Sequence, residues 1–521
     1  MNTPLYRQLA EHYLSAIQSG TLRPGERMPS VRRLMQQHEV SLSTALQLCR
    51  WLEAQGWLEA RPRSGYFIRT PRRLTVLAPA AEPATVRQID PAQYVGIHEK
   101  VSAIIAKGQR KVSVNLARAT GAPELYPHQQ LRQLATSLLR QHPTLLTKAI
   151  SPGGNPELRA ALAKRALDVG ISTAASEVVI THGCIEALNL ALRAVAHPGD
   201  VIAVESPTFY GLLQVLESLG LKALEIPTSP HTGISIEALE LAMQTYPNIK
   251  AVVVVPHLQN PLGSIMPDSH KQRLLHLCEQ HQIPLIEDDS YSALTNGDKI
   301  PTAIKHWDKT GNVIYCASLH KIIAPGLRIG WMLAGRWQAR VSMFKYAQTR
   351  YNEELSQRMM ASFLQSTHYE RHMRRLRQHL QQQREKMAEA VAAYFPPETR
   401  LSMPDGGVSL WVEMPPECSS QAVFDAALER DILISPGLLY SNSNRFDHFL
   451  RINCGAPYSD KLDDAMRTLG HIIANQQKHL FFIRCIDCRS VVMQCCLCAA
   501  NIAQYKDPEY CSFRGLSYAR K

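Results

Sequence analysis

Apolar side chains recur every three or four residues between positions 6 and 17, and this spacing of one helix face predicts a helix there. A Pro-Gly turn follows at 24–25, and Ser30 is suited to cap a second, short helix that ends near residue 39. A third helix is predicted from about residue 41 to residue 55, where Gly56 stops it. The chain therefore begins with three predicted helices.

Two short strands are predicted next, at residues 57–60 and 66–68, and the basic loop 61–65 joins them as a hairpin. Three helices followed by a two-stranded wing predict a winged helix-turn-helix, which we assign to residues 1–70. Residues 1–73 contain eleven arginines, no lysine and five acidic residues, a net charge of +6. Such a concentration of charge favours contact with the phosphates of double-stranded DNA. A small helical dimerisation module with a solvated basic face is the alternative.

From about residue 93 the pattern changes to short runs rich in Val and Ile, separated by helical segments. The runs are 178–180, 201–204, 251–255, 284–286 and 313–315. Buried strands that alternate with helices predict an α/β fold with a mostly parallel sheet. Helical patterns from 336 to about 394 and strand patterns at 408–413 and 449–453 predict a smaller C-terminal α+β subdomain.

The segments around this body differ from it in composition. Residues 71–92 are rich in Ala and Pro, which predicts an extended linker before a body at 93–476. Residues 477–521 form a Cys-rich tail that we expect to be disordered or foreign to the rest of the fold. Cys485-x-x-Cys488 and Cys496-x-Cys498 have a spacing that can bind zinc, but no glycine or other zinc-knuckle residue lies between them, so no metal is expected.

Composition narrows the class of protein. The chain has 521 residues, 45% of them hydrophobic, and no run of about 18 apolar residues, so it is expected to be a multidomain globular protein without a membrane span. The N-terminus has no signal-peptide pattern, and twelve cysteines are too few for a disulfide scaffold; both indicate a cytoplasmic protein. The net charge of +12 is consistent with an anionic partner.

Short motifs in the first 68 residues resemble those of the GntR-type winged-helix family. They are Arg23-Pro24-Gly25, Met28-Pro29-Ser30-Val31-Arg32, Val40-Ser41 and Gly65-Tyr66-Phe67. The resemblance implies that Arg32 contacts a phosphate or a base at a helix N-terminus. It also implies DNA contacts along the recognition helix and at the wing tip, from Ser41, Ser43, Thr44, Gln47, Arg61, Arg63 and Gly65. Arginine suits bidentate recognition of phosphate or guanine.

A single lysine, Lys321, stands among apolar and small residues just after the predicted strand 313–315, with Pro325-Gly326 close behind. This setting predicts a lysine held on a loop rather than on a solvated helix face. Burial lowers the pKa of a lysine and makes its amine nucleophilic. A surface lysine with an apolar stem is the alternative.

The spacing Ser318-x-x-Lys321, with Arg328 seven residues further on, resembles the cofactor-lysine signature of fold-type I pyridoxal 5'-phosphate (PLP) enzymes. The resemblance implies that Lys321 holds PLP as an aldimine and that Ser318 and Arg328 bind its phosphate. Three upstream motifs and one further loop, each after a predicted strand, occur in the same order as in that family. Open α/β sheets bind ligands at these strand ends.

Two of these loops concern the phosphate and one face of the ring. Gly183, Cys184 and Ile185 open a helix, where the glycine permits close approach and the backbone amides favour a phosphate. In the family, an aromatic residue after the next strand stacks on the pyridine ring. Phe209 is favoured for this role, with Tyr210 as the second choice and a plain core aromatic as the alternative.

The other loops concern the polar edge of the ring and the substrate. The resemblance implies that Asn260 and Tyr291 bind the phenolic oxygen and that Asp288 pairs with the pyridine nitrogen; a surface acidic turn is the alternative for Asp288. Arg451 matches the arginine that binds a substrate α-carboxylate, with a surface ion pair as the alternative. In this family the cofactor lies at a subunit interface, so a homodimer is expected.

The chain combines a GntR-type head with a body like that of fold-type I PLP enzymes, and in this it resembles the MocR-type regulators over roughly residues 3–475. The resemblance implies a DNA-binding transcription regulator whose body binds PLP and senses an amino acid or amine. The competing hypothesis is an active PLP-dependent aminotransferase whose head is incidental. Two positions depart from the family's pattern: Phe209 stands where many relatives have tyrosine, and residues 149–152 lack a tyrosine that often reaches the phosphate bound by the partner subunit.

Overall fold

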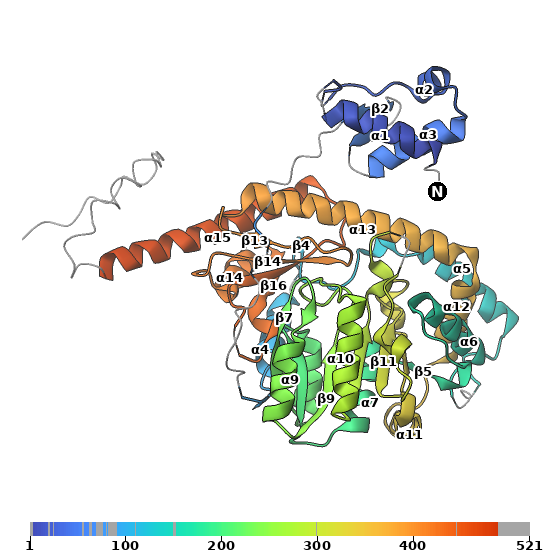
Figure 1. The fold of residues 1–521 in the computed structure, drawn as a ribbon, viewed down its shortest axis with the longest axis vertical. Helices are drawn as coiled ribbons and strands as arrows, with labels where there is room; N and C mark the ends of the chain where they lie inside the picture. The colour runs from blue at the N-terminus through green and yellow to red at the C-terminus, as the bar shows by residue number, and fades with distance from the viewer. Residues whose placement is uncertain are drawn as a thin grey trace, which may run out of the picture.

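The structure is a computed structural model, which describes residues 4–18, 21–23, 25–54, 57–61, 65–68, 77–79, 81, 91–109, 111–148, 153–297, 300–443 and 445–487. They form a small N-terminal head and a large body (Figure 1). Arg63, predicted at the wing tip, lies outside the described residues, and so do residues 149–152.

The head has the predicted helices and strands. They are α1 (Leu5–Gln18), α2 (Val31–His38), α3 (Leu42–Ala54), β1 (Leu58–Arg61) and β2 (Gly65–Ile68), with the strands paired antiparallel. Ser30 caps α2, since its side chain accepts a hydrogen bond from the backbone amide of Arg33 at 3.3 Å. Leu34, Leu48 and Leu52 are fully buried where the helices meet. The predicted winged helix-turn-helix is confirmed.

A nine-stranded sheet forms the centre of the body, in the order β3-β7-β6-β9-β10-β11-β12-β5, with β8 paired to β7. The strands are β3 (Gln93–Tyr94), β5 (Val178–Thr181), β6 (Val201–Ser206), β7 (Lys222–Ser229), β8 (Gly233–Ile234), β9 (Ile249–Val254), β10 (Leu285–Asp289), β11 (Val313–Ser318) and β12 (Gly330–Leu333). Neighbours from β7 to β11 run parallel, whereas β12 is antiparallel to β11 and β5. The mostly parallel sheet is therefore confirmed.

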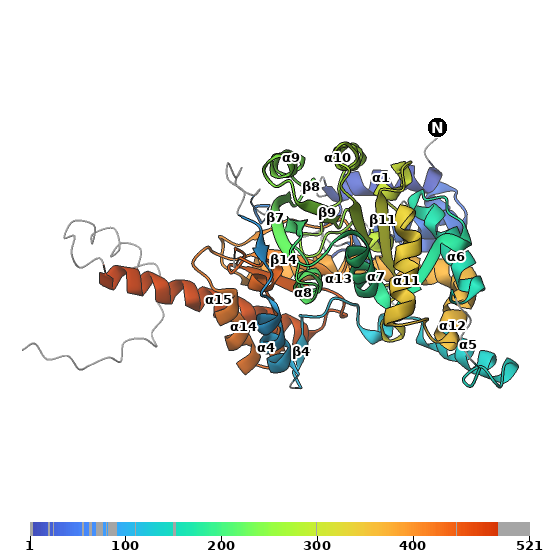
Figure 2. The same cartoon turned by 90° about the horizontal axis from the view of Figure 1, so that it is seen from below.

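Helices cover both faces of this sheet (Figures 1 and 2). Helices α7 (Gly183–Val195) and α8 (Tyr210–Ser218) pack on one face, and α9 (Ile236–Thr245) and α10 (Asp268–Gln280) on the other. The remaining helices of the large part are α4 (His98–Gly108), α5 (His128–Gln141), α6 (Pro156–Ala166), α11 (Gln338–Gln348) and α12 (Glu354–Gln365). Because both faces are covered, every residue of β6 and of β11 is buried, which explains their unbroken apolar runs.

The predicted smaller α+β subdomain is also present, and we call it the small subdomain. Its sheet has the order β13-β14-β17-β16, formed by β13 (Arg400–Leu401), β14 (Ser409–Glu413), β17 (Phe449–Asn453) and β16 (Ser435–Pro436). Its helices are α13 (Thr367–Tyr394), α14 (Ser420–Glu429) and α15 (Asp460–Asp487), and β15 (Ile432–Leu433) pairs with β4 (Val114–Asn115). Helices α13 and α15 lie side by side (Figure 1). Helix α15 continues past residue 476, and residues 488–521 lie outside the described part.

Four residues of the predicted linker are attached to the small subdomain, and we call residues 77–79 and 81 the strap. The backbone amide of Leu401, in the edge strand β13, donates a hydrogen bond to the carbonyl oxygen of Ala78 at 3.0 Å. The amide of Ala81 donates to Glu413 Oε2 at 3.2 Å, and Leu77 packs on the core of the small subdomain. The strap is thus fixed to one subdomain of the body.

The described residues contain neither a helix suited to span a membrane nor a cluster of metal ligands. None of their helices combines the length and the apolar character that crossing a bilayer requires. Nor do three or more of their His, Cys, Asp or Glu side chains gather in a way that could hold a metal ion.

Candidate functional site

A cavity of about 90 Å³ opens at the carboxyl ends of the parallel strands and brings together eight of the predicted cofactor residues. They are Cys184, Ile185, Phe209, Asn260, Asp288, Tyr291, Lys321 and Arg328, and Val255, Ser290 and His320 complete the lining. Gly183 lies beside it, since a Cβ atom there would be 3.4 Å from Arg328 Nη2. Of the aromatic pair, Phe209 lines the cavity and Tyr210 does not.

Lys321 follows β11 directly and points its amine toward a carbonyl. Its Nζ donates a hydrogen bond to the carbonyl oxygen of Ala119 at 3.2 Å and lies 5.5 Å from the ring centre of Tyr291. Burial, together with the positive charge of Arg451, lowers the pKa of Lys321 to about 8. A substantial fraction of this amine is therefore neutral near physiological pH and able to act as a nucleophile.

Asp288, in β10, presents one carboxylate oxygen to its protein neighbours. Its Oδ1 accepts hydrogen bonds from the Ser290 amide at 3.1 Å, the Ser290 hydroxyl at 2.7 Å and Cys184 Sγ at 3.2 Å. No described residue donates to Oδ2. Burial raises the pKa of Asp288 against the effect of these hydrogen bonds, so a cation placed in the cavity would favour the ionised carboxylate.

The first turn of α7 and the side chain of Arg328 make an electropositive corner of the cavity. Gly183 has a φ of 77°, and the side chain of the N-cap residue His182 makes no capping hydrogen bond to the first turn of α7. Arg328 is exposed, and no described residue forms a hydrogen bond or ion pair with its guanidinium. Free amides at a helix N-terminus and an unpaired guanidinium are the groups that bind a phosphate.

Ser318, which was predicted to bind the phosphate through its hydroxyl, does not line this cavity. Its hydroxyl is hydrogen-bonded to Nδ1 of His320, and the backbone amide of His320 donates to the same Oγ at 3.3 Å. His320 lines the cavity in its place, and burial together with the charges of Lys321 and Arg328 lowers its pKa to about 3. No role was predicted from the sequence for this neutral imidazole, although it is adjacent to Lys321.

Arg451, in β17, is buried behind the cavity. Its Nη1 donates to Asn260 Oδ1 at 3.2 Å, and its Nη2 donates to the carbonyl oxygen of Ala117 at 2.6 Å. Its Nε is buried and has no hydrogen-bond partner among the residues that the structure describes. The hydroxyl of Tyr291 donates to the carbonyl oxygen of Ala119 at 3.3 Å. The segment 117–119, which the sequence did not single out, therefore supplies acceptors to three predicted site residues.

In the head, the polar side chains predicted to meet DNA gather at the start of α3. The hydroxyl of Ser41 is 2.8 Å from that of Ser43 and 2.9 Å from that of Thr44, and it caps α3 by accepting from the Thr44 amide at 3.2 Å. Arg32 and Gln47 are exposed. Gly65 is exposed as well, with a φ of 94° at the start of β2, while Arg61 ends β1. A recognition helix contacts bases through this end.

Two family descriptions match the chain: "Bacterial regulatory proteins, gntR family" at residues 5–68 and "Aminotransferase class I and II" at residues 124–469. The protein named "Uncharacterized HTH-type transcriptional regulator YjiR" of Escherichia coli (strain K12) is 37% identical over 471 residues, which cover 90% of this chain and 98% of YjiR. The chain belongs to the aminotransferase class I and II family. With its gntR-type head it has the MocR-type architecture, and we refer to it below as the regulator.

Proteins named as aminotransferases are also similar to the regulator. Aromatic-amino-acid aminotransferase 1 of Thermococcus litoralis is 26% identical over 373 residues, which cover 70% of the regulator and 89% of that enzyme. The crystal structure of Pyrococcus horikoshii kynurenine aminotransferase in complex with PMP superposes with a TM-score of 0.67 at 25% identity. The superposition covers 73% of the regulator and 94% of the kynurenine aminotransferase chain.

The cofactor of this family is PLP, and the residues of the cavity fit it. Among the described residues, one carboxylate oxygen of Asp288 has no hydrogen-bond donor and the guanidinium of Arg328 has no partner. A protonated pyridine nitrogen suits the carboxylate of Asp288, and a phosphate suits the guanidinium of Arg328. Lys321 supplies the amine that an aldehyde requires.

Proposed function

We propose that the regulator binds double-stranded DNA through its head and that an amino acid or amine, taken up next to PLP in the body, changes that binding. The main observation that supports this proposal is that Lys321 and Arg451 both donate hydrogen bonds to backbone carbonyl oxygens of the segment 117–119. An amino acid has an amino group and a carboxylate. Its two ends would therefore meet groups that already lie along one short segment.

Each side chain around the cavity has a proposed task. PLP, when bound, supplies an aldehyde that reacts with primary amines and a ring that withdraws electrons. Lys321 is the proposed point of attachment, and Asp288 holds a proton on the ring nitrogen. The first turn of α7 and Arg328 bind the phosphate, Phe209 covers one ring face, and Asn260 and Tyr291 bind the phenolic oxygen. Arg451 exchanges the carbonyl oxygen of Ala117 for the carboxylate of the amino acid.

The strap offers a route from the body to the head. Arg451 belongs to the small subdomain, and the strap is bonded to β13 and Glu413 of the same subdomain. A carboxylate that draws Arg451 toward the cavity would therefore move the subdomain that carries the strap. Ligand-driven movement changes DNA affinity only when the two arrangements bind DNA differently.

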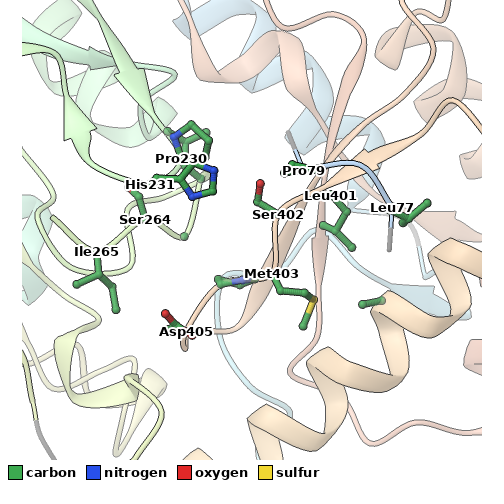
Figure 3. Close-up of a pocket in the computed structure, with 14 residues that line it drawn as sticks. Leu77, Pro79, Pro230, His231, Ser264, Ile265, Leu401, Ser402, Met403 and Asp405 are labelled. Carbon is green, nitrogen blue, oxygen red and sulfur yellow. The ribbon is translucent and has the colours of Figure 1, made fainter. Parts of the chain in front are cut away.

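A second cavity, of about 390 Å³, lies where these parts meet (Figure 3). Its walls come from Leu77 and Pro79 of the strap, from residues 262–265 just after Asn260, and from residues 401–405 of the small subdomain. The strap, the cofactor-side loop and the small subdomain therefore border one shared space. A shift of the small subdomain would change all three contacts together.

Active transamination is the second candidate, favoured by the presence of every predicted ring-binding residue in one cavity. Selection from random double-stranded DNA would first yield an operator. Operator affinity would then be measured by fluorescence anisotropy with PLP and each of a panel of amino acids and amines, beside an assay for keto-acid product. The regulator hypothesis expects at least one amine to change operator affinity severalfold. If all of them left it unchanged while product formed, the enzyme hypothesis would stand instead.

We also propose that the regulator is a homodimer in the cytoplasm, the compartment that holds bacterial DNA. A two-fold symmetric body would carry two heads and suit a site with two half-sites. Sedimentation-velocity experiments on the full chain should show a single species of twice the chain mass. A monomer that retained tight PLP binding would contradict the dimer.

A further inference from the structure

A buried lysine lies outside the cavity, in contact with residues at the start of α7. Lys345, in α11, has a side chain that is only 2% exposed, and its Nζ is 2.8 Å from Glu186 Oε2. The same Nζ donates to Thr349 Oγ1 at 3.0 Å and to Asn352 Oδ1 at 3.3 Å. It is also 3.3 Å from His182 Nδ1. A buried lysine with this many partners is held in one position.

Its partners hold the turn that precedes Gly183. Glu186 Oε2 accepts a hydrogen bond from the backbone amide of His182 at 2.6 Å. Asn352 Nδ2 donates to the carbonyl oxygen of Thr181 at 3.1 Å. Lys345 is therefore connected to both residues that lead into the first turn of α7. The carboxylate of Glu186 connects it to His182, and the side-chain amide of Asn352 connects it to Thr181. Neither Lys345 nor Glu186 lines the cavity.

We propose that Lys345 is a positioning residue for the phosphate group of the cofactor and that it acts by neutralising Glu186. This inference rests on the proposed phosphate site at the start of α7. A carboxylate bound to the first turn of a helix and a phosphate bound to the same turn are two anions that repel each other. A lysine bound to the same carboxylate oxygen as the His182 amide cancels the charge of Glu186 and leaves the amides of Gly183, Cys184 and Ile185 to the phosphate.

The charge state of the pair agrees with this role. Burial raises the pKa of Glu186, but the hydrogen bonds from His182, Lys345 and Thr349 outweigh that effect and lower it to about 2. Glu186 is therefore ionised at every pH at which the protein would work. Without Lys345, a full negative charge would remain beside the phosphate site.

The test is the affinity of the apo-protein for PLP and for pyridoxal, the same aldehyde without the phosphate. Both are measured by the absorbance change on binding. Lys345→Met should weaken PLP binding by about tenfold to a hundredfold, the usual effect of removing an outer partner of a ligand-binding group, and leave pyridoxal binding unchanged. An equal loss for both molecules would show a general structural role and overturn the proposal.

A second variant keeps the test decisive if Lys345→Met folds poorly. Glu186→Gln retains an oxygen that accepts from the His182 amide and removes the charge. Added to Lys345→Met, it should restore PLP affinity to within a few times the wild-type value. No recovery in the folded double variant would also overturn the proposal.

Lys271→Met is the matched control. Lys271 in α10 is 1% exposed, and its Nζ donates to Asp268 at 3.0 Å and to the carbonyl oxygen of Thr302 at 2.7 Å. Its loss removes a buried lysine away from α7 and should leave the ratio of PLP to pyridoxal affinity unchanged. If wild-type protein bound neither molecule, the proposed cofactor site itself would be wrong, which is a different outcome from a failure of Lys345.

Discussion

The guanidinium of Arg451 donates a hydrogen bond to the side-chain oxygen of Asn260 at 3.2 Å. Arg451 belongs to the small subdomain, and Asn260 lies in the loop after β9 of the central sheet. The residue proposed to bind the amino acid and a residue proposed to bind the cofactor are therefore joined directly across the two subdomains. A ligand that recruits Arg451 must alter this contact.

Replacing Arg451 should separate cofactor binding from amino-acid binding. Arg451→Ala should keep PLP affinity within a few times the wild-type value. It should weaken amino-acid binding by about tenfold to a hundredfold, because a hydrogen-bonded charge partner of the carboxylate is lost. Spectral titration of the PLP-loaded protein measures both. Arg467→Ala, which removes an exposed arginine paired with Asp463 on α15, is the control and should change neither. Wild-type amino-acid affinity in Arg451→Ala would place the carboxylate elsewhere.

The lowered pKa of Lys321 sets the pH at which cofactor attaches. Only the neutral amine attacks an aldehyde, so the second-order rate of PLP attachment should rise with pH and level off above about 8. An ordinary lysine would level off near 10.4. Stopped-flow absorbance between pH 6 and 10 gives the midpoint. Borohydride should then fix the cofactor mass on the peptide that contains Lys321, and Lys321→Ala should show no such mass. A labelled peptide from another region would refute the assignment.

Glu205 should make the body less stable as the pH rises. Its carboxyl group is buried, and burial raises its pKa to about 8 against the hydrogen bonds from Val255 and Gln259. A folded-state pKa above the unfolded one means that stability is full at low pH and is lost between about 4.5 and 8. Glu205 Oε1 has no hydrogen-bond partner within the described part of the chain, so glutamine reproduces the protonated form without a new clash.

The expected result is a Tm difference that depends on pH. Glu205→Gln should match wild type near pH 4.5 and exceed it by about 5 °C or more at pH 8.5. Calorimetry or thermal circular dichroism at several pH values measures the difference. Glu370→Gln is the control, since Glu370 is an exposed partner of Arg165, and its difference from wild type should not grow with pH. A constant difference for Glu205→Gln would mean that the carboxyl group is ionised in the fold.

DNA binding by the head should depend strongly on salt. If about six phosphates are contacted, log K should fall with log salt at a slope near −5. Arg32→Ala should reduce the slope by about one unit if Arg32 meets a phosphate, or relax one base position if it meets a base. Fluorescence anisotropy at several salt concentrations measures the slope. Arg7→Ala, which removes an exposed arginine paired with Glu11 on α1, is the matched control. Equal slopes for wild type and Arg32→Ala, with unchanged base preference, would contradict a contact at Arg32.

The sequence predicted most of the cavity because its members follow strands whose apolar runs are easy to recognise. Asn260, Asp288 and Lys321 each lie at or just beyond the carboxyl end of such a run, and parallel pairing brings these ends together. The strand β7 was missed because Lys222 and Glu225 interrupt its apolar pattern. Glu225 is nevertheless buried, where it accepts hydrogen bonds from Ser206 and Ser441.

Contacts within short loops were less accessible to sequence reasoning. Ser318 was expected at the phosphate, yet its hydroxyl is bonded to His320, because the turn at 318–320 orients both side chains toward each other. The segment 117–119 acts through backbone carbonyls, which no residue type encodes. The backbone hydrogen bond between Leu401 and Ala78 joins residues more than 300 positions apart. The side chains of alanine and leucine do not indicate such a contact.

The strap affects where a truncated protein that contains only the body should begin. Strand β13 ends its sheet, and the exposed amides and carbonyls of an edge strand invite pairing with other molecules. The bond from Leu401 to Ala78 closes part of that edge. A body that begins after residue 81 would leave it open and should self-associate, whereas one that begins before Leu77 should remain dispersed. We therefore expect the segment that carries the DNA-binding head also to protect the body against aggregation.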